Sequence, residues 1–83
     1  MTERTLLFDT GWLIGYRELA ATDRLAAKRV RAAVNALSRD PEPPGSIHIT
    51  GTSFYRLHID AYRILYDVTD DTVRIWSLGH APQ

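Results

Sequence analysis

The sequence predicts an α+β domain in which a strand, two helices and an antiparallel meander follow one another, with the helices on one sheet face. Three observations predict this order. A short apolar run stands near the start, apolar residues recur with a helical period over residues 24–39, and a period of two begins at residue 54. With 83 residues the chain has room for one domain, residues 1–83.

The first half carries local signals for one strand and two helices. A strand is expected over residues 4–8, because Asp9-Thr10-Gly11 ends the apolar run as a turn or a helix cap. From Trp12 to Ala20 apolar residues recur on one stripe of a short helix. After a second cap at Asp23, the longer helix is the clearest, with apolar residues at Ala26, Val30, Ala33, Val34 and Leu37.

The second half begins with a connector that cannot continue the helix. Residues 40–46 contain three prolines and Gly45, which remove backbone donors and permit a sharp reversal. Alternating strands then follow over 54–59, 62–68 and 73–78, joined by turns near Asp60-Ala61 and at Asp70-Asp71. Residues 47–50 would add a very short edge strand, so we expect a meander of three to four strands.

Composition excludes several classes of function. Ten basic and ten acidic residues cancel, so the whole-molecule field gives no strong attraction to nucleic acid, anionic lipid or acidic substrates. The absence of cysteine excludes disulfides and thiolate metal sites, and the three histidines have no ligand spacing, so we expect no metal or cofactor. No apolar run reaches the length of a signal sequence or a membrane span. We therefore expect a soluble cytoplasmic protein with no membrane partner.

The charges are nevertheless segregated along the chain. Residues 24–39 hold five basic residues and no acid, whereas acids gather near the turns of the meander. The simpler interpretation is a solvated helix face beside acidic turns. The alternative is a helix face that helps to hold a phosphate backbone or an acidic partner. The sequence is compatible with both.

Arg56, His58 and Arg63 are the candidate site. If the apolar alternates of residues 55–66 face the helices, these three side chains project together from the opposite face, on neighbouring strands. Arginine grips phosphate with a forked pair of donors, and histidine exchanges a proton near neutral pH. The set therefore suits an anionic substrate, although three ordinary surface residues would show the same pattern.

The aromatic residues are expected to pack in the core rather than to stack on bases. Trp12, Tyr62 and Tyr66 fit the apolar stripes described above. Trp76 is the exception, because strict alternation places it beside Arg74 and Leu78. An exposed strip of Trp76 and Leu78 would suit an apolar segment of a protein partner.

A family resemblance covers roughly residues 37–80. It is carried by Asp40-Pro41-Glu42-Pro43-Pro44-Gly45, Gly51, Tyr55-Arg56-Leu57, Tyr62-Arg63-Ile64-Leu65-Tyr66, Val68, Asp70-Asp71 and Leu78-Gly79-His80. In these residues, and in the order of its predicted elements, the chain resembles the RelE/ParE superfamily of toxins from bacterial type II toxin–antitoxin systems, and within it the RelE-like members.

The resemblance implies a compact toxin that a cognate, RelB-like antitoxin neutralises by wrapping around it. RelE-type members cut messenger RNA on the ribosome by attack of a ribose 2′-OH on the adjacent phosphate, whereas ParE-type members poison DNA gyrase. The leading hypothesis is therefore a metal-independent mRNA endoribonuclease with ribosome and mRNA as partners. Operator DNA would be contacted through the antitoxin complex.

The same resemblance assigns roles to four residues. Arg63 stands at the arginine of the family's "YR" strand and would stabilise the transition state. Arg56 takes the basic position of the preceding strand and would grip phosphate. His58 stands two residues further on and would act as general base. His80, in the terminal Gly79-His80, would act as the acid.

Two departures from the family pattern weaken the cleavage hypothesis. Residues 46–51 carry only His48 where many members have several basic residues, and the arginine that active members carry after the Gly-His pair is absent. Each lost cation of this kind costs roughly 10²–10³ in rate. The alternatives are therefore a ParE-like gyrase inhibitor or a catalytically inert binding protein of the toxin fold. A third hypothesis is a purely structural role in a DNA-binding repressor complex.

Overall fold

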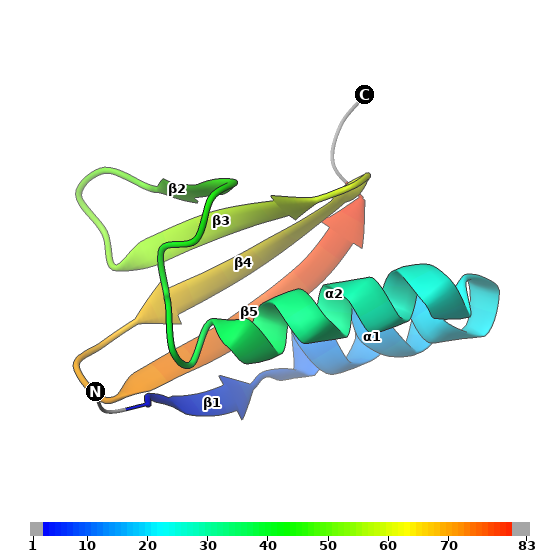
Figure 1. Cartoon of the computed structure of the whole chain (residues 1–83), viewed down its shortest axis with the longest axis horizontal. Helices are drawn as coiled ribbons and strands as arrows, with labels where there is room; N and C mark the ends of the chain where they lie inside the picture. The colour runs from blue at the N-terminus through cyan, green and yellow to red at the C-terminus, as the bar shows by residue number, and fades with distance from the viewer. Residues whose placement is uncertain (1–2, 81–83) are drawn as a thin grey trace.

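Two helices cover one face of a five-stranded mixed sheet in the computed structural model, which describes residues 3–80 (Figure 1). The elements in chain order are β1 (Thr5–Phe8), α1 (Thr10–Thr22), α2 (Arg24–Ala36), β2 (Ser46–His48), β3 (Phe54–Ile59), β4 (Tyr62–Val68) and β5 (Thr72–His80). The predicted α+β class and order of elements are confirmed. Neither helix within residues 3–80 is long and apolar enough to cross a membrane.

The sheet has the strand order β1-β5-β4-β3-β2. Strands β2 to β5 form the expected antiparallel meander, and the short edge strand is present at Ser46–His48. The turn between β3 and β4 uses Asp60 with φ 53°, a left-handed conformation that aspartate tolerates better than most residues. Strand β1 pairs in parallel with β5, from Thr5 opposite Thr72 to Phe8 opposite Ile75.

Helix α2 ends earlier than its apolar period. The Asp23 side chain caps its start by accepting a hydrogen bond from the Ala26 amide at 3.1 Å. The helix was expected to extend through residue 39 but ends at Ala36. Residues 37–39 continue as tighter turns in which each amide donates to the carbonyl three residues before it. The approaching Pro41 explains the end, because a residue before proline is driven out of the helical region.

The core lies between the helices and the sheet. Its fully buried members come from α1, α2, the turn that follows α2, β3, β4 and β5: Trp12, Val30, Val34, Leu37, Leu57, Ile64, Tyr66, Val73 and Ile75. The Tyr66 hydroxyl donates to the Pro41 carbonyl at 2.7 Å and so ties the connector to the sheet. Burial raises the pKa of Tyr66 to about 12. The predicted packing of Trp12 and Tyr66 is confirmed.

Helix α1 lies unusually close to β5 because glycine stands at both contact points. A Cβ added at Gly11 would lie 2.5 Å from the Trp76 carbonyl oxygen, and one at Gly15 would lie 2.4 Å from the Leu78 carbonyl oxygen. The two glycines are one helical turn apart and face the sheet together. Their missing side chains set the spacing between helix and sheet.

A β-bulge in β5 overturns one expectation. Leu65 pairs with Ser77 and the next residue, Tyr66, pairs with Ile75, so Trp76 is an extra residue in the ladder. Leu78 is consequently turned to the helix-covered face and is buried there. The predicted exposed strip of Trp76 and Leu78 does not form. Trp76 lies on the open face instead, with its ring 6.0 Å from that of Phe54.

Candidate active site

Arg56, His58 and Arg63 lie on the sheet face that the helices leave uncovered. Leu57 and Ile64, their chain neighbours, are fully buried on the helix side, so the pleat turns the three polar side chains outward. His58 pairs directly with Arg63 across β3 and β4. Directly opposed Cβ atoms lie about 5 Å apart in such a ladder. The sequence-based expectation that these three side chains emerge together is confirmed.

Arg56 is diagonal to Arg63 in the same ladder, because its direct partner on β4 is Leu65. Diagonal Cβ atoms are about 7–8 Å apart, a distance that two arginine side chains can bridge to reach one phosphate group. On its other side Arg56 pairs with Ile47 of β2. The aliphatic stem of Arg56 therefore runs between two apolar residues, and its charged end is directed to the surface.

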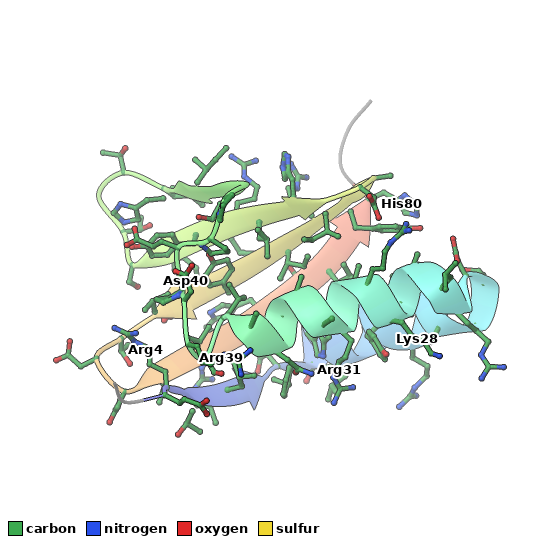
Figure 2. All side chains as sticks on the ribbon, viewed as in Figure 1. Arg4, Lys28, Arg31, Arg39, Asp40 and His80 are labelled. Atoms are coloured by element: carbon green, nitrogen blue, oxygen red, sulfur yellow. The ribbon has the colours of Figure 1, made fainter. Side chains whose placement is uncertain are left out.

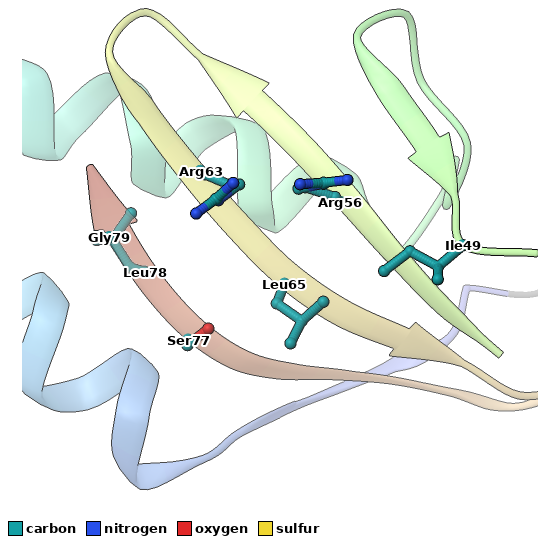
Figure 3. Close-up of a pocket in the computed structure, with 7 residues that line it drawn as sticks. All are labelled: Ile49, Arg56, Arg63, Leu65, Ser77, Leu78 and Gly79. Carbon is teal, nitrogen blue, oxygen red and sulfur yellow. The ribbon is translucent and has the colours of Figure 1, made fainter. Parts of the chain in front are cut away.

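The two arginines line an open hollow of about 500 Å³ (Figure 3). Its remaining walls come from β4, β5 and the segment after β2, and they include Leu65, Ser77 and Gly79. Gly79 stands directly opposite Arg63, and no atom of residues 3–80 lies within 4 Å of the position that a Cβ would take there. The missing side chain leaves open space next to the Arg63 guanidinium.

The positive charge of the hollow is not neutralised by a neighbouring acid. Within residues 3–80, neither Arg56 nor Arg63 forms an ion pair, and the buried Arg56 Nε has no hydrogen-bond partner. Asp60, in the turn beside them, is bound by Arg29 of α2 at 2.6 Å. Asp67 lies about 13 Å from Arg63 along β4 but is diagonal to Arg56 in the ladder; it forms no ion pair with either arginine within the described residues. The hollow therefore presents unpaired guanidinium groups to solvent.

His80 is not brought together with the other three residues. It pairs with Tyr62 at the end of the sheet, and the centroids of the two rings are 4.9 Å apart on the helix-covered side. There it borders a second, smaller hollow of about 260 Å³ between α1 and the ends of β4 and β5. The bulge at Trp76 is the cause, because one extra residue in β5 moves His80 to the face opposite Arg63.

Further along the open face lies a second group, formed by Arg74, Trp76 and Phe54, to which the sequence analysis assigned no part in the candidate site. The Arg74 guanidinium carbon is 5.4 Å from the centroid of the Trp76 ring, and Trp76 in turn contacts Phe54. Ser77, which lines the hollow, was expected on the other face. Arg74 and Trp76 lie on the open face as simple alternation predicts, whereas Ser77 is on this face because of the bulge, which no local pattern in residues 72–80 predicts.

The chemistry available to the site is that of cations and one imidazole. Within the described residues no group of three or more His, Asp or Glu side chains is arranged to hold a metal ion. Arg56 and Arg63 can bind a phosphate and stabilise negative charge that develops on it, and His58 can accept a proton beside them. Two guanidinium groups and one imidazole together suit an anionic substrate whose reaction includes a proton transfer.

Comparison with known proteins identifies the family. Residues 11–83 match the model described as ParE toxin of type II toxin-antitoxin system, parDE. The chain belongs to this toxin family. The toxin thus falls in the RelE/ParE superfamily that its motifs indicated. The comparison with curated proteins found no match.

Solved structures share the fold of the toxin over almost its whole length. The YoeB dimer from Staphylococcus aureus has 17% identity and a TM-score of 0.78, covering 96% of this chain and 99% of that one. A mutant of Escherichia coli RelE in the free state has 23% identity and a TM-score of 0.74, covering 98% and 85%. The RelBE2 toxin–antitoxin complex from Mycobacterium tuberculosis has 26% identity and a TM-score of 0.71, covering 100% and 97%.

Proposed function

We propose that this toxin is a metal-independent endoribonuclease that cuts messenger RNA on the ribosome. The observation that carries the proposal is the pair of unneutralised arginines, Arg56 and Arg63, which line one open hollow; His58 does not line it but stands directly opposite Arg63 in the ladder. The Cβ atoms of the two arginines are about 7–8 Å apart, so both guanidinium groups can bind the same phosphodiester. The likeness to RelE and YoeB structures supports the same choice.

In the proposed reaction His58 accepts the proton of the ribose 2′-OH, and the 2′ oxygen attacks the adjacent phosphorus. The bond from phosphorus to the 5′ oxygen of the next nucleotide breaks, which leaves a 2′,3′-cyclic phosphate and a 5′-hydroxyl. Arg63 and Arg56 stabilise the extra negative charge of the phosphorane. Since His80 lies on the other face of the sheet, water is the donor that we assign to the leaving 5′ oxygen.

The test is to add the purified toxin to a translation system and to map transcript ends by primer extension. The unaltered protein should yield cut transcripts, and Arg63→Ala should lower the cleavage rate by roughly 10²–10³. Arg74→Ala is the matched control, because Arg74 lies on the same sheet face outside the hollow. Circular dichroism verifies that each variant is folded. Intact transcripts with the unaltered toxin would refute the proposal.

A second candidate function is inhibition of DNA gyrase, which the match to the ParE toxin model favours. The modest number of cations in the hollow is consistent with it, because inhibition by binding needs no stabilised phosphorane. A supercoiling assay decides between the two. Gyrase inhibition that persists in Arg56→Ala and Arg63→Ala, together with uncut transcripts, would replace the nuclease proposal.

We also propose a cognate antitoxin as the protein partner, with operator DNA contacted through that complex. The support comes from relatives solved as complexes, among them YoeB–YefM from Staphylococcus aureus and RelE–RelB from Pyrococcus horikoshii. Co-expression of the toxin with the product of a neighbouring reading frame, followed by affinity purification of the pair, tests this proposal. A partner that neither co-purifies with the toxin nor relieves its effect on growth would count against it.

A further inference from the structure

A straight line of basic side chains follows the outer side of α2. Arg24, Lys28 and Arg31 recur at intervals of four and three residues, so they lie on one helix face, and Arg39 continues the line beyond the helix end. Figure 2 labels Lys28, Arg31 and Arg39 of this set. All four are exposed, whereas the buried residues of α2 face the sheet. We call these four residues the basic stripe. The residue between Arg31 and Arg39 on this face is the polar Asn35.

Within residues 3–80, most of the positive charge of the basic stripe is not neutralised by acidic side chains. Arg31 is held in place by contacts with two aromatic rings, its guanidinium carbon lying 5.6 Å from the Tyr16 centroid and 5.9 Å from the Phe8 centroid. Arg39 lies 3.9 Å from Glu3, and because both side chains are about two-thirds exposed this contact neutralises little. Arg29, the remaining basic residue of α2, is turned about 100° from Lys28 and is already paired with Asp60.

The basic stripe and the hollow lie on opposite sides of the molecule. The helices cover one face of the sheet (Figure 1), and Arg56 and Arg63 project from the other. The four side chains of the stripe are exposed, away from the buried face of α2. The stripe extends over about 10 Å from Arg24 to Arg31 and roughly 20 Å to Arg39. A duplex presents one phosphate on each strand per about 3.4 Å of its axis, so the stripe can face several consecutive phosphates.

The composition of the stripe favours nucleic acid over an acidic protein. Protein interfaces need an apolar centre, whereas nucleic-acid interfaces are polar and strongly positive. Leu25, an exposed apolar residue of α2, lies three residues before Lys28 at the edge of the stripe, and this one side chain does not make an apolar centre. The choice of RNA rests on the proposed function, because a reaction that begins at a ribose 2′-OH already brings RNA to the opposite face.

We propose that the basic stripe is a second RNA-binding surface, which holds the backbone of double-helical RNA while the hollow on the other side takes the strand to be cut. The toxin then contacts RNA from both sides. Binding at the stripe requires no particular base sequence, because phosphate contacts carry no direct sequence information.

The test measures binding separately from cleavage. The probe is a fluorescent 20-base-pair RNA duplex with 2′-O-methyl groups, which cannot undergo attack by a 2′-OH, and affinity is measured by anisotropy between 50 and 200 mM KCl. The variant Arg24→Gln/Lys28→Gln/Arg39→Gln should reduce the slope of log affinity against log salt by about 2–3 and weaken binding at 50 mM at least about tenfold. Arg31 is left in place because it packs on Phe8 and Tyr16.

Single substitutions provide the matched control. Lys28→Gln and Arg29→Gln remove one charge each from adjacent exposed positions, but only Lys28 belongs to the stripe. Lys28→Gln should lower the salt slope by about one, and Arg29→Gln should leave it nearly unchanged. If both substitutions lower the salt slope equally, the proposal is overturned, because the RNA duplex is then attracted by the net charge of the protein rather than by the basic stripe. Circular dichroism checks that the variants remain folded.

Three further arms complete the experiment. The variant Arg56→Ala/Arg63→Ala should bind the duplex as the unaltered toxin does, so a failure of the nuclease proposal leaves this measurement intact. A DNA duplex of the same sequence that binds equally well, with the same dependence on the stripe, would overturn the choice of RNA. Stripe-dependent binding of a poly-glutamate peptide without binding of the RNA duplex would assign the surface to an acidic protein instead.

Discussion

Replacing Gly15 by alanine tests the close approach of α1 to β5. In an ordinary exposed helix this change is stabilising, because alanine is favoured over glycine by about 1 kcal/mol per residue. Here the new methyl group would lie 2.4 Å from the Leu78 carbonyl oxygen and 3.1 Å from the Leu78 Cβ. Van der Waals separations are about 3.5 Å, so helix or strand must move by roughly 1 Å.

The expected result is a net loss of stability. Forcing an extra methyl group into a well-packed core costs about 1–3 kcal/mol. The upper end applies at Gly15, because the obstructing atom belongs to the backbone of β5, where Leu78 is held in the ladder opposite the fully buried Ile64 of β4. Subtracting the gain in helix propensity leaves a loss of about 2 kcal/mol in the free energy of unfolding. Gly11→Ala should act in the same direction, against the Trp76 carbonyl.

Urea unfolding followed by tryptophan fluorescence measures the effect, since Trp12 is a buried residue of α1. Gly79→Ala is the control, because within residues 3–80 no atom lies within 4 Å of the position of its new Cβ. That substitution should be neutral or stabilising by a few tenths of a kcal/mol, through the lower entropy of the unfolded chain. A Gly15→Ala protein that gains stability would refute the tight contact between α1 and β5.

Two further predictions concern the connector and the helix cap. Burial raises the pKa of Tyr66 to about 12, so the native state keeps a proton that the unfolded chain loses near pH 10. The contribution of this group to the free energy of unfolding is complete below pH 10 and falls by about 1 kcal/mol between pH 10 and 11. Urea unfolding at both pH values should show this loss in the unaltered protein and a smaller loss in Tyr66→Phe. If both proteins lose the same free energy of unfolding between pH 10 and 11, the assignment to Tyr66 is refuted. Asp23→Ala removes the side-chain cap on the Ala26 amide and should cost about 1 kcal/mol, whereas Asp23→Asn should cost only a few tenths, as measured by thermal unfolding. An alanine variant as stable as the asparagine variant would contradict the cap.

Local patterns were sufficient for most of the secondary structure. The helical period of α2 and the alternation of β3 and β4 each depend on residues a few positions apart, and the sequence displays them directly. The same alternation was enough to place Arg56, His58 and Arg63 on one face, because the ladder between β3 and β4 is regular from Phe54 to Tyr62.

The remaining features depend on contacts between distant segments. The pairing of β1 with β5 joins residues more than 60 positions apart, and no period within either strand encodes it. The bulge at Trp76 adds one residue to β5, and every side chain after it is turned to the face opposite the one that simple alternation predicts. Leu78 was assigned to the surface by counting through that bulge, and His80, which the family resemblance had assigned to the site, is turned to the other face by it.

The pairing of β1 with β5 has a consequence for synthesis of the toxin in the cell. Ribosomes add residues from the N-terminus at roughly 5–20 per second, so residues 5–8 leave the ribosome seconds before residues 72–75 that complete their ladder. The strand β5 also supplies Gly79 and Ser77 to the hollow. A nascent chain therefore lacks part of the hollow until strand β5 emerges, so the two arginines do not face a complete hollow for most of that time.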